Sequence, residues 1–400
     1  MTTTVPAGPI RVDARRLGYE PALDGARAVA VVAVMLFHFL GPELFAGGLI
    51  GVDVFFVLSG FLITNLLLDE RNRTGAVSLR GFYHRRILRL FPAMYALLAM
   101  VAVVAVFIGA TYPTVWAELG AAALYSYQMF LAFFGFPTPD SPRVLFHLWS
   151  LSVEEWFYFF WPVLLLAGLK TITRQRALIW LAGAWAAMWM GIRLSGNVVG
   201  VDWVSDTPFA GTGVGYAGEV VYRMSAMRFD QLIIGCLLAI AVRRWALVPG
   251  GRARPGLAVG AVIGAALLVT ELALAGRVGF FDPFGSIGFN AALLGIPFVV
   301  LWIHLYPGGG PSRFLAIPVM VWIGKRSYGL YLWHEVLNVL TPNPGGKVAV
   351  LVRTAVLMVA SMGVAELSWR FIESPFLRRK ESRYGNPQDR DRDATTAAPS

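Results

Sequence analysis

The stretch LDGARAVAVVAVMLFHF, residues 23–39, is long and apolar enough to cross a bilayer, yet it carries Arg27 near its start and His38 near its end. A helix of about 20 apolar residues spans the hydrocarbon core. An Arg at the bilayer centre costs roughly 3 kcal/mol on insertion scales, so an ionisable residue within a span indicates a functional site. The stretch therefore predicts a membrane helix that carries function.

Similar apolar runs recur along the chain and decide its class. The 400 residues are 57% hydrophobic and 14% charged, whereas soluble domains carry roughly 25% charged residues. The runs lack the alternation of barrel strands. We therefore predict an all-α, polytopic membrane helical bundle with about ten transmembrane helices. The expected spans are 23–41, 48–68, 91–110, 147–169, 177–194, 228–243, 256–275, 287–306, 326–341 and 348–372.

An eleventh apolar run, 114–134, decides the topology. Lys and Arg in short loops mark the cytoplasmic side of a membrane protein. With the N-terminus inside, all the basic loops fall inside only if 114–134 does not cross, and the 195–222 loop, which has no Lys or Arg, then falls outside. We expect a re-entrant or interfacial segment here. The alternative is an ordinary eleventh span at which the charge rule fails.

Composition also limits partners and domains. The net charge of +10 lies mostly in short loops between spans, so we expect no nucleic-acid partner. The five histidines show no HxxH or HExxH spacing, so no metal is expected. A membrane domain at 21–377 is expected between disordered cytoplasmic tails at 1–20 and 378–400, which are polar and low in apolar residues.

Two pairs of residues share a helix face and suggest chemistry. Arg27 and His38 are 11 residues apart, close to three full turns, so they share one helix face about 16 Å apart along its axis and can serve the two ends of one elongated ligand. A neutral imidazole at His38 can take a proton from a hydroxyl. Arg86 and Arg89 are spaced i, i+3, as in a clamp for phosphate. The alternatives are a snorkelling Arg27, a core His38 and a basic anchor for lipid headgroups.

The segment HLWSLSVEEWFYFFWP, residues 147–162, places His147 and Glu155 roughly on one helix face. A carboxylate there can orient an imidazole or bind sugar hydroxyls. The alternative is a capping box in which Ser152 and Glu155 start the helix, which leaves Glu154 unexplained.

Asp53 and His334 stand within two further apolar segments. Asp53, in GVDVFFVLSGFLIT (51–64), can pair with His38 across a short hairpin and raise the basicity of its imidazole, or it can cap a broken helix. His334, in GKRSYGLYLWHEVL (324–337), lies mid-span beside Glu335, and the alternative there is hydrogen bonding that only aids packing.

Together these stretches resemble the membrane-bound acyltransferase 3 family, which includes bacterial O-acyltransferases of lipopolysaccharide, other glycans and macrolides. The match covers roughly residues 20–377, in the family's order. The matching pieces are Arg27 with ten residues before His38, GVDVFFVLSGFLIT, FYHRRILRLFPAMY, HLWSLSVEEWFYFFWP, GKRSYGLYLWHE and FIESPF.

The resemblance implies ten membrane helices and an acyl-CoA donor, often acetyl-CoA, bound from the cytoplasm. It implies that Arg27 and His38 are essential and that Arg86 and Arg89 form the family's R-x-x-R motif. Our hypothesis is that His38 is the general base, that Arg27 positions or charge-balances the donor, and that the two motif arginines hold the CoA phosphates. Either Glu154 or Glu155 matches the family's acidic residue, and we favour Glu155.

We expect Asp53 to assist catalysis and Glu154, His147, His334 and Tyr331 to bind substrate. Some members carry a fused extracytoplasmic hydrolase-like domain, for which this chain has no room, so we expect a stand-alone enzyme.

The predicted function is therefore integral-membrane O-acyl transfer from acyl-CoA to a hydroxyl of a carbohydrate-containing acceptor. The acceptor is expected to be a cell-envelope glycolipid or polysaccharide, or a glycosylated secondary metabolite. The expected location is the bacterial plasma (inner) membrane, crossed several times, with both termini cytoplasmic. The alternative is a transporter or flippase of a small anion or lipid, in which the buried charges form a translocation path.

Overall fold

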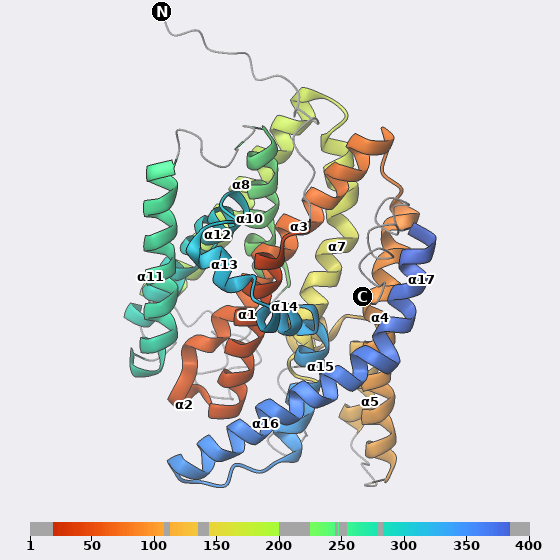
Figure 1. Cartoon of the computed structure of the whole chain (residues 1–400), viewed down its shortest axis with the longest axis vertical. Helices are drawn as coiled ribbons and strands as arrows, with labels where there is room; N and C mark the ends of the chain where they lie inside the picture. Colours follow the sequence, from red (N-terminus) through yellow and green to blue (C-terminus); the bar gives the residue numbers. More distant parts are fainter. Residues whose placement is uncertain are drawn as a thin grey trace, which may run out of the picture.

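The computed structural model describes residues 19–107, 113–134, 144–199, 225–244, 247, 254–278 and 283–384, and every regular element in these ranges is a helix. Most of the 195–222 loop and most of the two expected tails lie outside the described residues. The described chain folds into a bundle of long helices (Figure 1).

Each of the ten expected spans falls mainly on one helix, although the helix at Ser327–Leu340 has 14 residues and rises only about 21 Å. Five helical segments have the length and hydropathy of a membrane span, within the described ranges: Pro21–Leu40, Ala46–Thr74, Leu79–Phe107, Pro255–Leu274 and Lys347–Arg379. The predicted all-α membrane bundle is confirmed, and ten crossings remain a prediction. The helices that hold these ten segments are α1 (Pro21–Leu40), α3 (Ile50–Thr74), α4 (Leu79–Phe107), α7 (Leu148–Gly168), α8 (Ile172–Val199), α10 (Ser225–Arg244), α11 (Arg254–Val278), α12 (Pro283–Leu305), α15 (Ser327–Leu340) and α16 (Lys347–Ser368).

Helix α1, which carries Arg27 and His38, lies near the centre of the bundle (Figure 1). Pro21 begins it, and Gly41 ends it with a φ of +81° that favours glycine. It packs against α3, α15 and the short helices α13 (Gly310–Leu315) and α14 (Pro318–Lys325). A Cβ on Gly25 would lie 1.9 Å from the backbone oxygen of Leu315, so this contact is backbone against backbone. After α1, the short elements α2 (Pro42–Phe45) and η1 (Ala46–Leu49) lead directly into α3.

The 114–134 run forms two short helices, α5 (Pro113–Ala123) and α6 (Tyr127–Phe134). They rise about 16 and 12 Å, well short of the roughly 30 Å of a hydrocarbon core. Between them Tyr125 has a φ of +51°, which breaks the helix. The run therefore does not cross as one helix, as expected for a re-entrant or interfacial segment.

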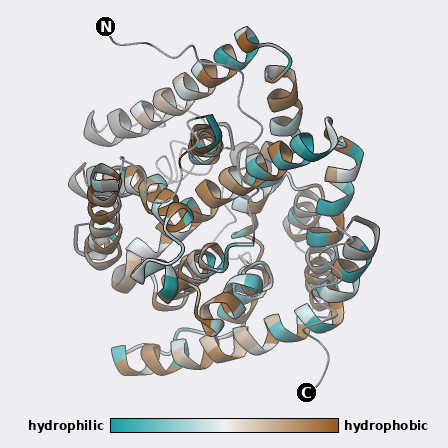
Figure 2. Cartoon of the chain, turned by 45° about the horizontal axis from the view of Figure 1, so that its top comes forward, coloured by the Kyte–Doolittle hydropathy of each residue, from teal (hydrophilic) through white to brown (hydrophobic). Residues whose placement is uncertain are grey.

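Several helices are apolar on the faces that point away from the bundle (Figure 2). Trp180 on α8, Val262 on α11 and Val359 on α16 are each about 70% exposed or more. Extensive exposed apolar surface is unfavourable in water and suits contact with lipid tails.

At the C-terminal side, a π turn, η2 (Trp369–Glu373), leads to α17 (Ser374–Tyr384), which packs on α4 and extends into the segment expected as a tail.

Candidate active site

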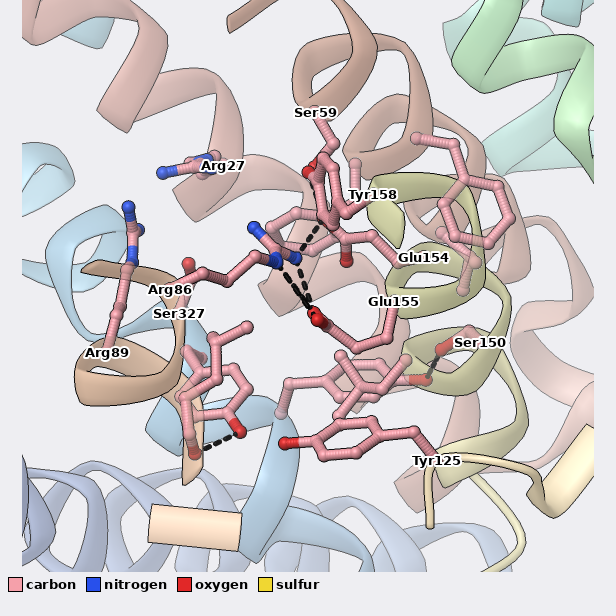
Figure 3. Close-up of a pocket in the computed structure, with 17 residues that line it drawn as sticks. Arg27, Ser59, Arg86, Arg89, Tyr125, Ser150, Glu154, Glu155, Tyr158 and Ser327 are labelled. Carbon is pink, nitrogen blue, oxygen red and sulfur yellow. Dashed lines mark hydrogen bonds and ion pairs between the residues drawn. The ribbon is translucent and has the colours of Figure 1, made fainter. Parts of the chain in front are cut away.

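A pocket of about 760 Å³, including its open mouth, lies among α1, α3, α4, α7 and α15 (Figure 3). Its polar lining consists of three arginines, two glutamates, four tyrosines and three serines. The residues are Arg27, Arg86, Arg89, Glu154, Glu155, Tyr125, Tyr158, Tyr328, Tyr331, Ser59, Ser150 and Ser327. The turn between α5 and α6 thus delivers Tyr125 to the pocket.

Arg86 is held by Glu155 within this pocket. Its Nε lies 2.9 Å and its Nη2 2.5 Å from Glu155 Oε1, and the guanidinium carbon lies 3.2 Å from the ring centre of Tyr158. Glu154, one residue earlier, accepts hydrogen bonds from Ser59 Oγ at 2.5 Å and Tyr158 Oη at 2.6 Å. Glu154 Oε1 also lies 3.7 Å from Arg86 Nη2, so both glutamates pair with Arg86, and Glu155 makes the closer contact.

Arg27 and Arg89 line the same pocket without an acidic partner. In the described part of the chain neither makes a hydrogen bond or an ion pair, and the buried Nε of Arg27 is unsatisfied. Figure 3 shows both guanidinium groups on the side of Arg86 that faces away from Glu155. Because no carboxylate forms an ion pair with the Arg27 and Arg89 guanidinium groups in the described chain, these two groups can bind an anionic ligand.

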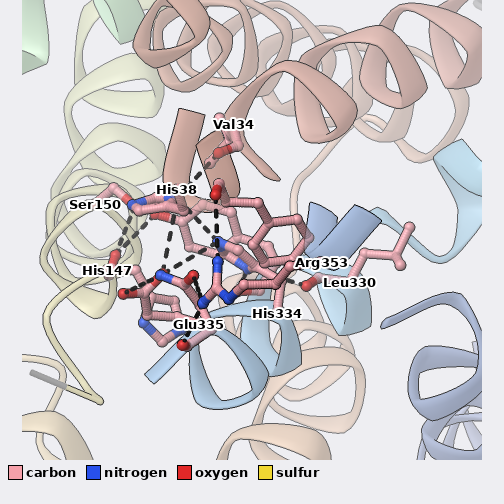
Figure 4. Close-up of polar contacts among 11 residues, drawn as sticks. Val34, His38, His147, Ser150, Leu330, His334, Glu335 and Arg353 are labelled. Atoms are coloured by element: carbon pink, nitrogen blue, oxygen red, sulfur yellow. Dashed lines mark hydrogen bonds and ion pairs between the residues drawn. The ribbon is translucent and has the colours of Figure 1, made fainter. Parts of the chain in front are cut away.

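A second polar group lies near the C-terminal end of α1 (Figure 4). His38 Nδ1 is 3.0 Å from His334 Nε2, and each of these nitrogens is 3.9 Å from Glu335 Oε2. The His147 ring packs against His334 with centroids 5.5 Å apart. The structure thus brings together three histidines expected from separate segments.

Tyr331 and Ser150 connect the pocket to this histidine group. Both line the pocket, and their hydroxyl oxygens are 2.6 Å apart. Tyr331 Oη also donates to the His147 backbone oxygen at 2.8 Å, and the Tyr331 ring lies 5.6 Å from that of His334. The sequence analysis did not predict three hydroxyl residues of the site, Ser59, Ser150 and Tyr158. The signal that could have found them is their spacing, because each lies within one or two helical turns of a predicted site residue.

Asp53 does not pair with His38 as the sequence suggested. It forms an ion pair with Arg228 of α10, and both side chains are fully buried. Arg228 reaches α3 because α10 packs along α3, where Gly60 and Gly235 allow close approach of the two backbones. A buried charge needs a partner, and Arg228 provides it.

The capping box at Ser152 and Glu155 is also wrong. Helix α7 begins at Leu148, so both residues lie inside it, and Ser152 Oγ donates to the Leu148 backbone oxygen at 3.0 Å. Glu155 faces Arg86 and His147 faces His334, so the expected contact between Glu155 and an imidazole is not formed with His147.

The donor atoms of His38, His334 and Glu335 lie within 4.8 Å of one another, a spacing that can hold a metal ion. The absence of HxxH and HExxH spacing says nothing about such a group, because its histidines come from α1 and α15. The neighbouring carbonyl oxygens indicate that the two Nδ1 atoms carry protons. His38 Nδ1 is 3.0 Å from the Val34 carbonyl oxygen, and His334 Nδ1 is 2.8 Å from that of Tyr331.

Comparisons with known proteins agree with the motifs. A family model described as "Acyltransferase domain" matches residues 20–367. The peptidoglycan O-acetyltransferase OatA of Listeria monocytogenes is 33% identical over 386 residues, covering 89% of this chain and 56% of the relative. The "Putative peptidoglycan O-acetyltransferase YrhL" of Bacillus subtilis is 31% identical, covering 89% and 55%.

A "Putative O-acetyltransferase" of Staphylococcus aureus is 30% identical over 375 residues, covering 92% of this chain and 58% of the relative. The chain thus spans a little over half the length of the curated relatives it matches. No solved structure matches. Because the family model covers most of the chain, this protein belongs to the acyltransferase 3 family.

Proposed function

We propose that this chain transfers an acetyl group from acetyl-CoA to a hydroxyl of a cell-wall glycan at the bacterial plasma membrane. The family supports acyl transfer, and two relatives are named for O-acetylation of peptidoglycan. One observation carries the proposal: a pocket with two unpaired arginines shares Tyr331 and Ser150 with the histidine group around His38.

In this proposal Arg27 and Arg89 bind the phosphates of CoA. Arg27 and His38 lie on one face of α1, about 16 Å apart along its axis. That separation suits an elongated donor whose phosphates and thioester lie at opposite ends. Both termini are then cytoplasmic, with the arginines toward that side, as the distribution of basic loops suggests.

His38 acts as the general base. It accepts the proton of the glycan hydroxyl while the oxygen attacks the thioester carbonyl, the carbon–sulfur bond breaks, and the thiolate of CoA leaves and takes up the proton. General-base help of this kind is worth about 10² to 10⁴ in rate. Arg86 and Glu155 contribute by shaping the pocket wall. Asp53, paired with Arg228, contributes to the packing of α3.

The test uses the purified full chain in detergent with acetyl-CoA and soluble peptidoglycan fragments. Free CoA thiol and alkali-labile acetate on the glycan are measured together. Wild type should form both in equal amounts, and His38→Ala, checked for folding by its melting temperature, should form neither. His304→Gln, on α12 and outside both polar groups, serves as the matched histidine control. Absence of turnover by wild type with acetyl-CoA and with longer acyl-CoA would refute the proposal and favour transport.

A further inference from the structure

The hydrogen bonds of His334 determine which of its nitrogens carries a proton. Its Nδ1 lies 2.8 Å from the Tyr331 backbone oxygen and 3.2 Å from that of Leu330. Both neighbours are acceptors only, so Nδ1 must be the donor. A neutral imidazole has one N–H, and its other nitrogen is an acceptor. His334 Nε2 therefore presents a lone pair.

That lone pair is directed at His38. His38 Nδ1 lies 3.0 Å from His334 Nε2 and 3.0 Å from the Val34 backbone oxygen, again two acceptors. His38 Nδ1 is therefore protonated in the resting state, and the lone pair that can accept a proton is on Nε2. The nitrogen that a base in this position uses is set by the hydrogen bond that the other nitrogen makes.

The ring of His334 is fixed by its surroundings. The side chain is fully buried, and the rings of Phe39 and His147 pack on it at 6.0 and 5.5 Å between centroids. Its Nδ1 is tied to the turn of α15 that also carries Tyr331, whose side chain lines the pocket. His334 is thus a rigid acceptor on a helix other than the one that carries His38.

We infer that His334 is a positioning residue, which holds His38 in the Nδ1–H tautomer so that Nε2 acts as the base. The sequence analysis predicted that His334 binds substrate, whereas its hydrogen bond to His38 indicates a positioning role. When His38 Nε2 accepts a proton, the same hydrogen bond from Nδ1–H to His334 stabilises the imidazolium. This inference rests on the proposed role of His38.

The first test is a direct observation of the protons. The full chain is labelled with ¹⁵N in its histidine rings, and the spectra are recorded in detergent; with five histidines in the chain, His38→Gln and His334→Gln assign the two signals. The expected result is a proton on Nδ1 of both rings. A proton on Nε2 of His38, or a metal bound by His38 Nδ1 and His334 Nε2, would overturn the inference, and metal analysis of the same sample identifies the second case.

The second test is kinetic. His334→Leu removes the acceptor and should lower kcat at least about 10²-fold, with KM for acetyl-CoA unchanged within about twofold. His334→Gln, whose amide oxygen can accept the same hydrogen bond, should recover most of the lost kcat. Full kcat in His334→Leu would contradict the inference.

The two proposals fail in different ways. An active His38→Ala variant would refute the base assignment itself. An inactive His38→Ala together with a fully active His334→Leu would leave the base in place and remove only the role of His334. If His334→Leu does not fold, the spectrum of wild type still decides the tautomer.

Discussion

Glu155 binds two nitrogens of Arg86 at once, with the Tyr158 ring covering the guanidinium from the other side. A charge-assisted pair of this geometry is among the stronger hydrogen-bonding arrangements in proteins. Arg86 is therefore largely neutralised before any donor arrives. We therefore propose that the phosphate clamp predicted at Arg86 and Arg89 is formed instead by Arg27 and Arg89, which lie on different helices.

The two arginines of α4 should consequently behave differently when truncated. Arg89→Ala should raise KM for acetyl-CoA about 10- to 100-fold, because a charged hydrogen bond contributes about 1.5–3 kcal/mol. Arg86→Ala should mainly lower the melting temperature, because it leaves Glu155 without its partner. Steady-state kinetics and thermal melts of the two variants side by side decide this. Equal effects on KM would mean that Arg86 contacts the donor despite Glu155.

The buried pair of Asp53 and Arg228 is expected to be structural. Asp53→Asn removes the charge that pairs with Arg228 in a fully buried site, and breaking a buried ion pair costs about 3–5 kcal/mol. Activity per folded molecule should stay within about threefold of wild type, because general-base chemistry depends on His38. The control is Asp53→Asn combined with Arg228→Gln, which should recover part of the stability. A folded Asp53→Asn protein that has lost turnover would instead return Asp53 to the catalytic group.

The sequence predicted the helices well because long apolar runs have few alternatives in a membrane. It also placed Arg27 and His38 on one face, since that relationship depends only on helical periodicity. The partners of these residues could not be read in the same way. His38 meets His334 across 296 positions and Asp53 meets Arg228 across 175, and only tertiary packing brings them together.

The capping box shows a different limit of sequence reasoning. The S-x-x-E pattern at Ser152 is compatible with a helix start, yet α7 has already begun at Leu148. The tertiary pairing of Glu155 with Arg86 decides its side-chain direction instead. A local pattern of this kind is reliable only where no stronger distant partner competes for the same carboxylate.

The contact between α3 and α10 depends on glycine. A Cβ on Gly60 would lie 1.9 Å from the Leu232 backbone oxygen, and one on Gly235 would lie 2.1 Å from that of Val57. Small residues allow this close packing of membrane helices. Gly60→Val should therefore lower the melting temperature strongly and reduce the yield of folded protein. Gly183→Val, on α8 where a Cβ would meet nothing within 4 Å, is the matched control and should melt near wild type.

Arg353 of α16 ties together the ends of the two helices that carry His38 and His334. Its guanidinium donates to the backbone oxygens of Phe39 at 3.3 Å, Asn338 at 2.8 Å and Thr341 at 2.6 Å. These carbonyls lie at the C-terminal ends of α1 and α15, where backbone oxygens commonly lack the intrahelical partner of mid-helix positions. Arg353 therefore fixes the distance between α1 and α15 at the level of the histidine group.

Removing this tie should affect both stability and rate. Arg353→Met should cost about 2–3 kcal/mol of unfolding free energy and lower kcat about tenfold, with KM for acetyl-CoA unchanged, because His38 and His334 lose their fixed spacing while the pocket arginines stay in place. Arg353→Lys should not restore kcat, since one ammonium cannot reproduce the planar fork that reaches all three carbonyls. Arg370→Met removes an exposed arginine paired with Glu366 and is the control. A normal kcat in Arg353→Met, with a lowered melting temperature, would show that the tie serves stability alone.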